Sequence, residues 1–451
     1  MTALLRRSLL AALAVVMFPL WAGPSAAQVL LRDAEIESWI ERMSFPIFEA
    51  AGVRPESVDI YLIGDPTPNA AAGGLNMLIH TGLITIADTP NQVEGVIAHE
   101  TGHIAGGHSI RTAEAIAAAS RPAMLSLVLG AALLAVGAPP ELGISAIGAG
   151  QQLGQSSFLS FSRGQESAAD QAAISYLEAV GSSSKGLVEF FGKLQNRQLI
   201  SGRQPIPYLQ THPLALQRSN VVQSRGSTSE YWDDEDSPEE IFEMNMIQAK
   251  IVGFMNEPFV TQRLYPLTDQ SDPARYARAV AYYRGSDLEA ASREIDYLIG
   301  KYPDNPYFHE LKGQMLFEHG RALEAIAPHR TSTELAPQFA LLKINLGRAL
   351  VSTEDEDHVN EAIVILNEAL RIERDNAFGW TELARAHGLK GDDDLAALAQ
   401  AEAYYHYGAS REALRFAMRA RDSLRPGTPE HQQALDIIVA TADQVQQQRR
   451  R

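Results

Sequence analysis

The segment His99-Glu100-Thr101-Gly102-His103 combines two histidines and a glutamate at a spacing that suits metal chemistry. Residues four apart on a helix lie on one face, so the imidazoles of His99 and His103 can bind one zinc ion. Glu100 lies beside that ion and can act as the general base for a metal-activated water. The pattern therefore predicts a zinc-dependent hydrolase site with Glu100 as its catalytic residue.

A later acidic pair can complete this site. Glu166 and Asp170 are four residues apart in an alanine-rich segment, so both carboxylates face the same way on a helix. Glu166 can serve as the carboxylate of a His₂Glu site, and Asp170 can hydrogen-bond the outer nitrogen of a ligand histidine. The alternative is a solvated helix face. The apolar positions around the pair favour a buried helix, where unpaired carboxylates would be costly.

A helix that contains the motif and two strands before it would position these residues. Apolar residues recur at helical spacing through 93–104, and Gly106-Gly107 supplies a stop signal. Upstream, we expect strands at 58–63 and 76–81, joined as a hairpin across a turn at 65–69. An exposed strand edge beside the motif helix could accept an extended peptide as an additional strand. The alternative is sheet structure with no binding role.

Composition excludes several classes of protein. The 451 residues carry a net charge of −17, and a strongly acidic chain repels phosphate backbones, so no nucleic-acid partner is expected. The chain has no cysteine, which leaves histidine and carboxylate as the available zinc ligands. Hydrophobic residues make up 45%, enough to bury a large core, and this length suggests two or three domains.

The first residues have the pattern of an export signal. Arg6 and Arg7 precede an apolar run, and Ser25-Ala26-Ala27 supplies small residues at a cleavage site before Gln28. We expect residues 1–27 to be a cleaved signal peptide and the mature chain to be periplasmic. A second apolar stretch covers 123–150, and its uncharged run, 123–138, is short for a membrane span before Pro139 and Pro140 interrupt it. It is expected to form a hairpin of core helices, a lid over the site, or a segment that dips into a bilayer.

The second half of the chain is helical and repetitive. Residues 226–270 form an acidic linker followed by a bridging helix, whose start is marked by Ser237, Pro238 and Glu240. From 271 onwards, small residues recur at the tetratricopeptide interval, since Gly313 and Gly347 are 34 apart. Stacked helix pairs of this kind form a concave surface that suits peptide or protein binding. The alternative is a helical bundle without repeats.

The motifs taken together resemble the M48 family of zinc metallopeptidases. The resemblance rests on His99-Glu100-x-x-His103, Gly106-Gly107-His108 and Glu166-x-x-x-Asp170. Residues 32–37, 82–84 and 211–214 with Arg218 are similar to the exported branch of this family. C-terminal tetratricopeptide repeats are also found in that branch, so the resemblance covers most of the mature chain.

The resemblance implies a role for each site residue. His99, His103 and Glu166 would bind one Zn²⁺ per chain, Glu100 would be the base, and Asp170 would support a ligand. His212 would reach the metal from a loop as a regulatory fourth ligand that keeps the enzyme latent. Asn69 and Arg218 are candidates for contact with the substrate or transition state, although Arg218 could instead pair with a carboxylate. His108 is not expected to be a ligand.

We therefore expect a mostly α chain with a zincin-type α+β metalloprotease domain, which contains a small sheet, followed by an α-solenoid of tetratricopeptide-like helix pairs. The expected boundaries are 1–27 for the signal peptide, 28–225 for the protease domain, which includes 123–150, and 226–270 for the linker. The repeats would occupy 271–425, and a terminal helix and polar tail would occupy 426–451.

The same resemblance implies an endopeptidase that acts in quality control and assembly of outer-membrane proteins. Its substrates would be unfolded or stalled outer-membrane proteins, and its repeats would contact the outer-membrane assembly machinery. Peripheral contact with a membrane would accompany this role. The alternative is a latent protease that acts mainly as a chaperone or adaptor.

Overall fold

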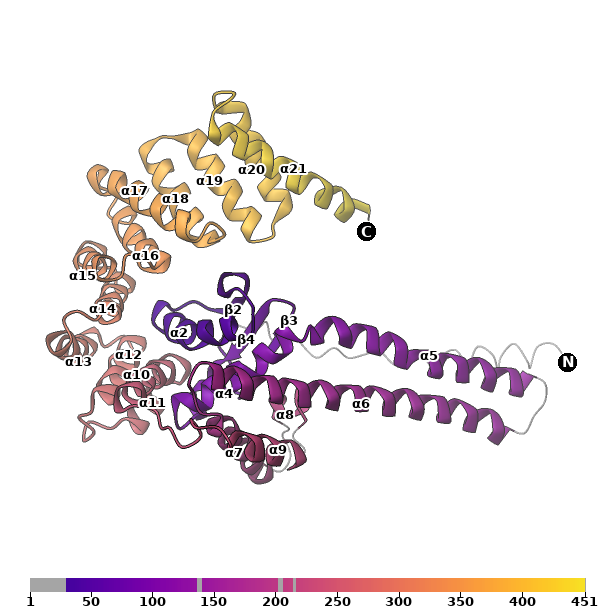
Figure 1. Cartoon of the computed structure of the whole chain (residues 1–451). Helices are drawn as coiled ribbons and strands as arrows, with labels where there is room; N and C mark the ends of the chain where they lie inside the picture. The colour runs from indigo at the N-terminus through magenta and orange to yellow at the C-terminus, as the bar shows by residue number, and fades with distance from the viewer. Residues whose placement is uncertain (1–29, 136–139, 202–205, 214–215, 451) are drawn as a thin grey trace.

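A computed structural model describes residues 30–135, 140–201, 206–213 and 216–450. The expected signal peptide, 1–27, lies outside the described residues. The described chain is mostly helical with one small sheet, as the sequence predicted (Figure 1). Among the described residues, no helix is long and apolar enough to cross a membrane.

The sheet has four strands in the order β1-β2-β4-β3. Their bounds are Leu30–Leu31 (β1), Asp59–Ile63 (β2), Ala70–Gly73 (β3) and Asn76–His80 (β4). The prediction that 58–63 and 76–81 form a hairpin is wrong, because β2 and β4 pair in parallel. The connection between them contains β3, which folds back antiparallel to β4 and becomes an edge of the sheet. Apolar alternation predicted the strands but carried no information about their direction.

Helices cover this sheet and form one core with it. The helices are Ala34–Ala50 (α2), Thr81–Ile86 (α3), Pro90–Ala105 (α4), Lys185–Ser201 (α7), Pro207–Thr211 (α8) and Leu216–Gly226 (α9), and a short 3-10 helix spans Pro55–Ser57 (η1). Phe48, Met77, Ile97 and Phe190 from four of these elements are almost fully buried in the shared core. The core holds α4, which carries the metal motif, against the sheet.

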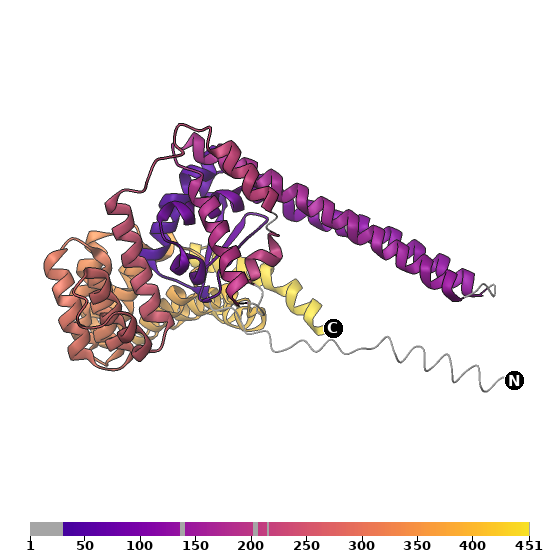
Figure 2. The same cartoon turned by 90° about the horizontal axis from the view of Figure 1, so that it is seen from below.

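Two long helices leave this core as an antiparallel arm. They are His108–Ala135 (α5) and Pro140–Ala179 (α6), and they project well beyond the rest of the molecule (Figures 1 and 2). The expectation that 123–150 could be a hairpin of core helices is wrong for the described side chains. Met124, Leu125 and Val128 are each about two-thirds exposed among the described residues.

The linker region leads into the helical second half. Pro238–Met255 (α10) begins with a complete capping box, in which Ser237 and Glu240 satisfy each other's backbone N–H groups, and Pro258–Leu264 (α11) follows. This start agrees with the sequence signal. The packing of α10 was not predicted, since it lies against both α4 and the first helix of the repeats.

The remaining helices stack as antiparallel pairs in an arc (Figure 1). They are Asp272–Arg284 (α12), Leu288–Lys301 (α13), Pro306–Glu318 (α14), Ala322–Leu335 (α15), Ala340–Val351 (α16), Glu356–Ile372 (α17), Ala377–Lys390 (α18), Asp393–His406 (α19), Ser410–Ser423 (α20) and Pro429–Arg450 (α21). A Cβ at Gly347 would lie 2.6 Å from Leu366, so the absence of a side chain lets α16 and α17 approach closely. The solenoid of helix pairs is confirmed.

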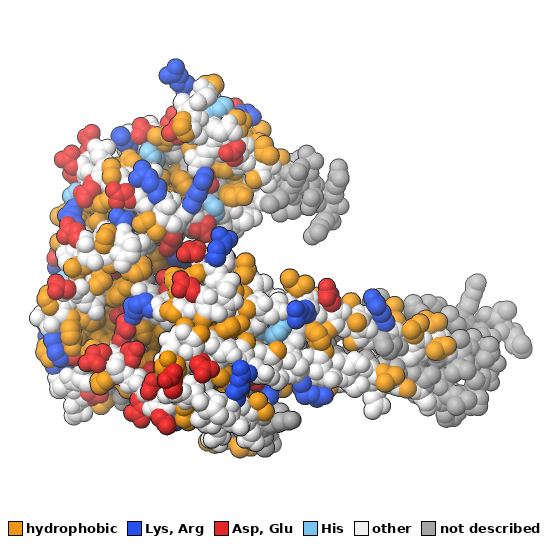
Figure 3. All heavy atoms as spheres, viewed as in Figure 1, with side chains coloured by type: hydrophobic (Ala, Val, Ile, Leu, Met, Phe, Trp, Pro, Cys, Tyr) orange, Lys and Arg blue, Asp and Glu red, His pale blue; other side chains and the backbone are white. Residues whose placement is uncertain are grey.

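The arc of the solenoid curves around the start of α2. Arg32 forms an ion pair with Glu373 at 3.0 Å, and Tyr276 donates a 2.6 Å hydrogen bond to Glu35. Figure 3 shows an open hollow on this face, between the C-terminal helices and the protease body with its arm. The two halves of the chain therefore contact each other at one end of the hollow.

Candidate metal centre

Helix α4 carries the two histidines and the glutamate of the motif. Pro90 occupies its first turn, where a missing N–H costs no hydrogen bond, and the helix ends at Gly106. His99 and Glu100 are fully buried, and His103 is slightly exposed. The motif side chains consequently have a fixed orientation towards the interior of the protease domain.

Helix α6 brings the second pair of carboxylates to α4. The two helices pass very closely at Gly102, where a Cβ would lie 2.9 Å from the carbonyl oxygen of Ala169. Only glycine permits this approach, which places Glu166 and Asp170 beside the imidazole of His99. Gly102, the residue directly before His103, therefore has a packing role.

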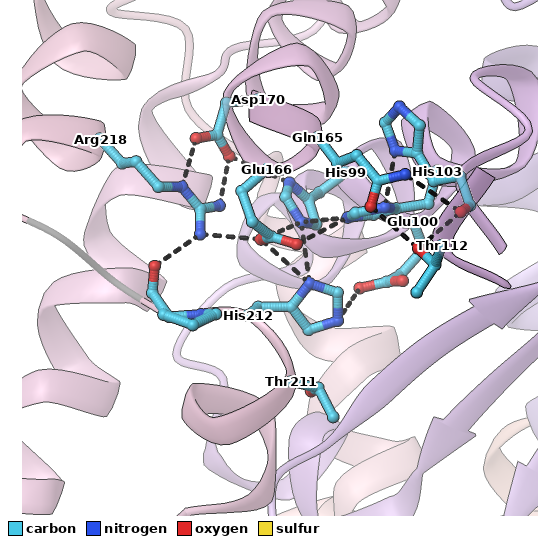
Figure 4. A network of polar contacts seen from close by, with 12 residues as sticks. His99, Glu100, His103, Thr112, Gln165, Glu166, Asp170, Thr211, His212 and Arg218 are labelled. Carbon is cyan, nitrogen blue, oxygen red and sulfur yellow. Dashed lines mark hydrogen bonds and ion pairs between the residues drawn. The ribbon is translucent and has the colours of Figure 1, made fainter. Parts of the chain in front are cut away.

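His212 enters the site from the opposite side, directly after α8. Its ring is buried and stacks on the ring of Tyr208, with centroids 4.7 Å apart. Its Nδ1 faces His99 and Glu166, and its Nε2 lies 3.5 Å from Oε1 of Glu100. The structure therefore places His212 in the site, where the resemblance had implied it (Figure 4).

The donor atoms of His99, His103, Glu166 and His212 all lie within 4.8 Å of one another. Nε2 of His99 lies 3.1 Å from Nε2 of His103, 3.3 Å from Nδ1 of His212 and 3.6 Å from Oε2 of Glu166. Tetrahedral zinc with ligands at about 2.0–2.1 Å requires neighbouring donors to be about 3.3 Å apart. The three separations from Nε2 of His99 are close to this value, so the donor set is compact enough to hold one zinc ion.

Asp170 and Arg218 hold the outer side of the cluster. Oδ1 of Asp170 lies 3.0 Å from Nδ1 of His99, which leaves Nε2 free to face the other donors. Arg218 binds Asp170 through two hydrogen bonds of 2.7 and 2.8 Å and contacts Glu166 at 2.8 Å. Of the two alternatives for Arg218, the structure shows the carboxylate pairing.

His108 supports His103 in a similar way. Nδ1 of His108 lies 2.9 Å from Nδ1 of His103, and its ring is not part of the donor cluster. Gln165 donates a hydrogen bond to the carbonyl oxygen of His108, and Thr112 contacts both residues (Figure 4). The expectation that His108 is no ligand agrees with this geometry. Its contact with His103 was not foreseen.

Electrostatics keep the carboxylates of the cluster ionised. Burial raises the pKa of Glu166, but His212 and His99 outweigh burial and bring this pKa far below its usual value. Burial likewise raises the pKa of Asp170, and Arg218 and His99 lower it by more. Burial lowers the pKa of His103 to about 2, helped by the neighbouring His99. Negative carboxylates and neutral imidazoles are the forms that bind a metal. Burial lowers the pKa of His99, but Asp170 and Glu166 outweigh burial and raise it to about 9, so a bound metal would displace a proton from this imidazole.

Two further residues have buried polar side-chain atoms without a hydrogen-bond partner among the described residues. Asn69 directly precedes β3, and its side-chain oxygen is buried with no hydrogen-bond partner in the described part of the chain. No contact joins it to the donor cluster among those residues. Sequence analysis missed Tyr208, whose hydroxyl is buried at the site and whose pKa is raised by burial and by Glu100 and Glu166. Its position four residues before His212 is the signal that could have identified it.

The comparisons with known proteins agree with this geometry. Residues 30–225 match the model described as Peptidase family M48. Over 411 residues the chain is 26% identical to the beta-barrel assembly-enhancing protease (BepA) of Escherichia coli (strain K12), and the match covers 88% of this chain and 81% of that protein. Metalloprotease YcaL of the same organism is 28% identical over 173 residues, which is 38% of this chain and 62% of that protein.

Solved structures align with part of the chain. The crystal structure of MamA aligns with a TM-score of 0.29 and 17% identity, covering 38% of this chain and 97% of that chain. The match to Peptidase family M48 includes every member of the donor cluster, from His99 to His212.

Proposed function

We propose that this metallopeptidase, whose residues 30–225 form a Peptidase family M48 domain, is a zinc-dependent endopeptidase of the periplasm that acts in the assembly and quality control of outer-membrane proteins. The observation that carries the catalytic part is the convergence of donor atoms from His99, His103, Glu166 and His212 on one point beside Glu100. The name of the relative that matches most of the chain supports the client class. The solenoid supports binding of protein substrates.

A bound zinc ion would polarise a water molecule and stabilise the oxyanion formed at a peptide carbonyl. The residues of the chain supply the remaining steps. Glu100 would take the proton of the water on a carboxylate oxygen and pass it to the leaving amine. Asp170 and His108 would keep Nε2 of His99 and of His103 directed at the metal by binding the opposite ring nitrogen.

The edge strand β3 would align the substrate. It has one free edge in the sheet and packs against α4, so an extended peptide paired with it would run beside the motif helix. Asn69 lies at the start of this strand, where its unpaired side-chain oxygen could accept a hydrogen bond from the substrate.

His212 would act as a latch. As a fourth protein donor it would occupy the position that a catalytic water requires, so cleavage would need its withdrawal. Arg218 holds this loop closed by donating a 3.0 Å hydrogen bond to the carbonyl oxygen of Pro213. This same closed geometry favours the second candidate function, in which a latent protease acts mainly as a chaperone or adaptor for outer-membrane proteins.

The projecting arm would provide peripheral contact with a membrane. Met124, Leu125 and Val128 expose apolar side chains at neighbouring positions, so the helix is apolar on more than one face. Arg121 and Arg163 are exposed on α5 and α6 nearer the body and suit lipid phosphates. The solenoid would then be left to contact the outer-membrane assembly machinery.

Cleavage of an unfolded outer-membrane β-barrel protein by the purified mature chain tests the proposal. We expect His212→Ala to cleave faster than the unsubstituted chain, and His212→Ala combined with Glu100→Gln to be inactive. Loss of the base should cost a factor of about 10²–10⁴. If neither chain with an intact Glu100 cleaves while zinc is bound stoichiometrically, the chaperone function is favoured instead.

A further inference from the structure

A cavity lies away from the metal centre, between the start of α2 and the concave face of the solenoid. It has a volume of about 410 Å³ and is lined by residues of the first α2 turn, α10, α14, α15, α16 and α18. Binding pockets for small groups are typically about 300–1,000 Å³, so this cavity can hold a large side chain with its backbone. Both halves of the molecule contribute to its walls.

Most of the wall is apolar. Phe254 and Met255 come from α10, Phe317 from α14, Leu341 from α16 and Phe378 from α18. These side chains converge from four helices that are far apart in the sequence. A ligand that enters the cavity would therefore bury an apolar group, which is the main source of affinity in such pockets.

One cation lines the cavity without a partner. The guanidinium of Arg348 lies 4.3 Å from the ring centroid of Phe317 and 5.5 Å from that of Phe378. Within the described chain, it forms no hydrogen bond or ion pair. Arg330 and Arg275, on other helices of the solenoid, are paired with Glu361 and Glu294 respectively. The five N–H donors of Arg348 are thus available to a ligand, and its plane suits a carboxylate.

Other polar residues lie in the same wall. Arg32 is paired with Glu373 and Asp33 with Lys250, whereas Glu310 and His329 bear on the binding of a ligand. Glu310 accepts a hydrogen bond from Asn345, and burial raises its pKa to about 7 although Lys250 acts in the opposite direction. Nδ1 of His329 is buried and has no hydrogen-bond partner among the described residues. The cavity therefore offers an unpaired cation and an unpaired ring nitrogen to the polar atoms of a ligand.

We propose that this cavity binds a peptide that carries a carboxylate next to a large apolar side chain, with the carboxylate on Arg348 and the apolar side chain between Phe317, Phe378 and Leu341. Charge complementarity selects the anion, and the apolar walls select the side chain. A peptide is the occupant because the concave face of stacked helix pairs presents extended binding surface. The carboxylate can belong to a chain terminus or to an acidic side chain.

Binding of labelled hexapeptides to the full mature chain carrying Glu100→Gln tests this pocket without cleavage. One peptide ends in phenylalanine with a free carboxylate, a second is its C-terminal amide, and a third is amidated with glutamate before the phenylalanine. We expect the free acid or the glutamate peptide to bind at least tenfold more tightly than the neutral amide, because a charge-assisted pair is lost in the amide. The tighter of the two identifies the source of the carboxylate.

Arg348→Met should lower the affinity for the acidic peptide to that for the amide and leave the amide unchanged. Arg293→Met, at an exposed arginine on the same solenoid, is the matched control and should have no effect. Leu341→Trp should fill the cavity and weaken all three peptides, with circular dichroism confirming the fold. Equal binding of acid and amide, an equal effect of Arg348→Met on both, or no binding by the Glu100→Gln chain would overturn the proposal. Proteolysis is not measured, so these outcomes are independent of the metal site.

Discussion

The contact of His108 with His103 indicates that the histidines of the motif are held in a fixed orientation and do not merely lie close together. For Nε2 of His103 to face the metal as a donor, its Nδ1 must carry the proton, and Nδ1 of His108 is the acceptor 2.9 Å away. Asp170 has the same relation to His99. Each histidine of the motif therefore has its own support, one from the following helix and one from α6.

We predict that His108→Ala weakens zinc binding by about 10–100-fold, as is typical for loss of such a support. Competition with a chelator of known affinity measures this change. His108→Asn retains a polar group near the Nδ1 position and should recover part of the affinity. His80→Ala, at another buried histidine outside the cluster, should bind zinc like the unsubstituted chain. Equal zinc affinity of His108→Ala and His80→Ala would contradict the role of His108.

Residue types and spacing were sufficient to predict four of the side chains that converge, because helical periodicity fixes which ones share a face. His99 and His103 are four apart on α4, and Glu166 and Asp170 are four apart on α6. Local spacing carries no information on side chains that arrive from other elements. The stacking of Tyr208 on His212 and the approach of α4 to α6 at Gly102 depend on tertiary packing, so they appear only in the structure.

The arm is the element whose surface differs most from that of a soluble helix pair. Its exposed apolar residues occupy neighbouring positions along α5, so a protein groove that contacts one face would leave others in water. A bilayer surrounds an inserted tip and would cover all faces. The apolar sequence favoured burial, and this expectation was wrong for the described side chains, because composition carries no information about which element would cover them.

Substitution on the outer part of α5 should weaken contact with lipid. We expect the mature chain to float with vesicles of phosphatidylethanolamine and phosphatidylglycerol. Leu125→Glu with Val128→Glu should reduce the bound fraction at least tenfold, since each side chain contributes about 1.5–3 kcal/mol when buried. The control is Leu323→Glu with Val364→Glu, two exposed positions on the solenoid. If both double variants float alike, the arm is not a membrane contact.

His329, in the wall of the cavity between α2 and the solenoid, makes the stability of the folded chain depend on pH. Burial, together with the charge of Arg348, lowers the pKa of His329 to about 4, below the ordinary value of about 6.5. Between these values the unfolded chain binds more protons than the folded chain, so stability due to His329 falls as pH drops from about 6.5 to 4. Glu310 has a raised pKa and acts in the opposite sense.

The comparison that isolates His329 is the difference in stability between the unsubstituted chain and His329→Gln, since the contribution of Glu310 is common to both. We predict that this difference favours the unsubstituted chain more at pH 7 than at pH 4.5. Urea denaturation at several pH values measures it. A difference that does not change with pH would show that His329 titrates normally in the folded chain.

At the scale of the whole molecule, one buried cation joins the two halves. Lys250 of α10 is 1% exposed, and its Nζ lies 2.7 Å from Asp33 and 3.0 Å from Glu35. Tyr276 of the solenoid donates to the same Glu35. Lys250 and Asp33 are 217 residues apart in sequence, which explains why periodicity and repeats predicted two units but not how they meet.

This cluster should control how firmly the solenoid is held against the protease domain. Lys250→Met would leave Asp33 and Glu35 buried without their cation, and loss of one partner of a buried pair costs about 3–5 kcal/mol. Because the cluster lies at the contact between the halves, we expect the variant to be cleaved by an added protease between residues 226 and 270 under conditions where the unsubstituted chain is intact. Arg321→Ala removes an exposed pair with Glu324 and should leave the chain as resistant as before. Equal resistance of both variants would mean that the apolar contacts of α10 and the Arg32–Glu373 pair suffice to join the halves, and that the buried cation adds specificity without holding the arrangement in place.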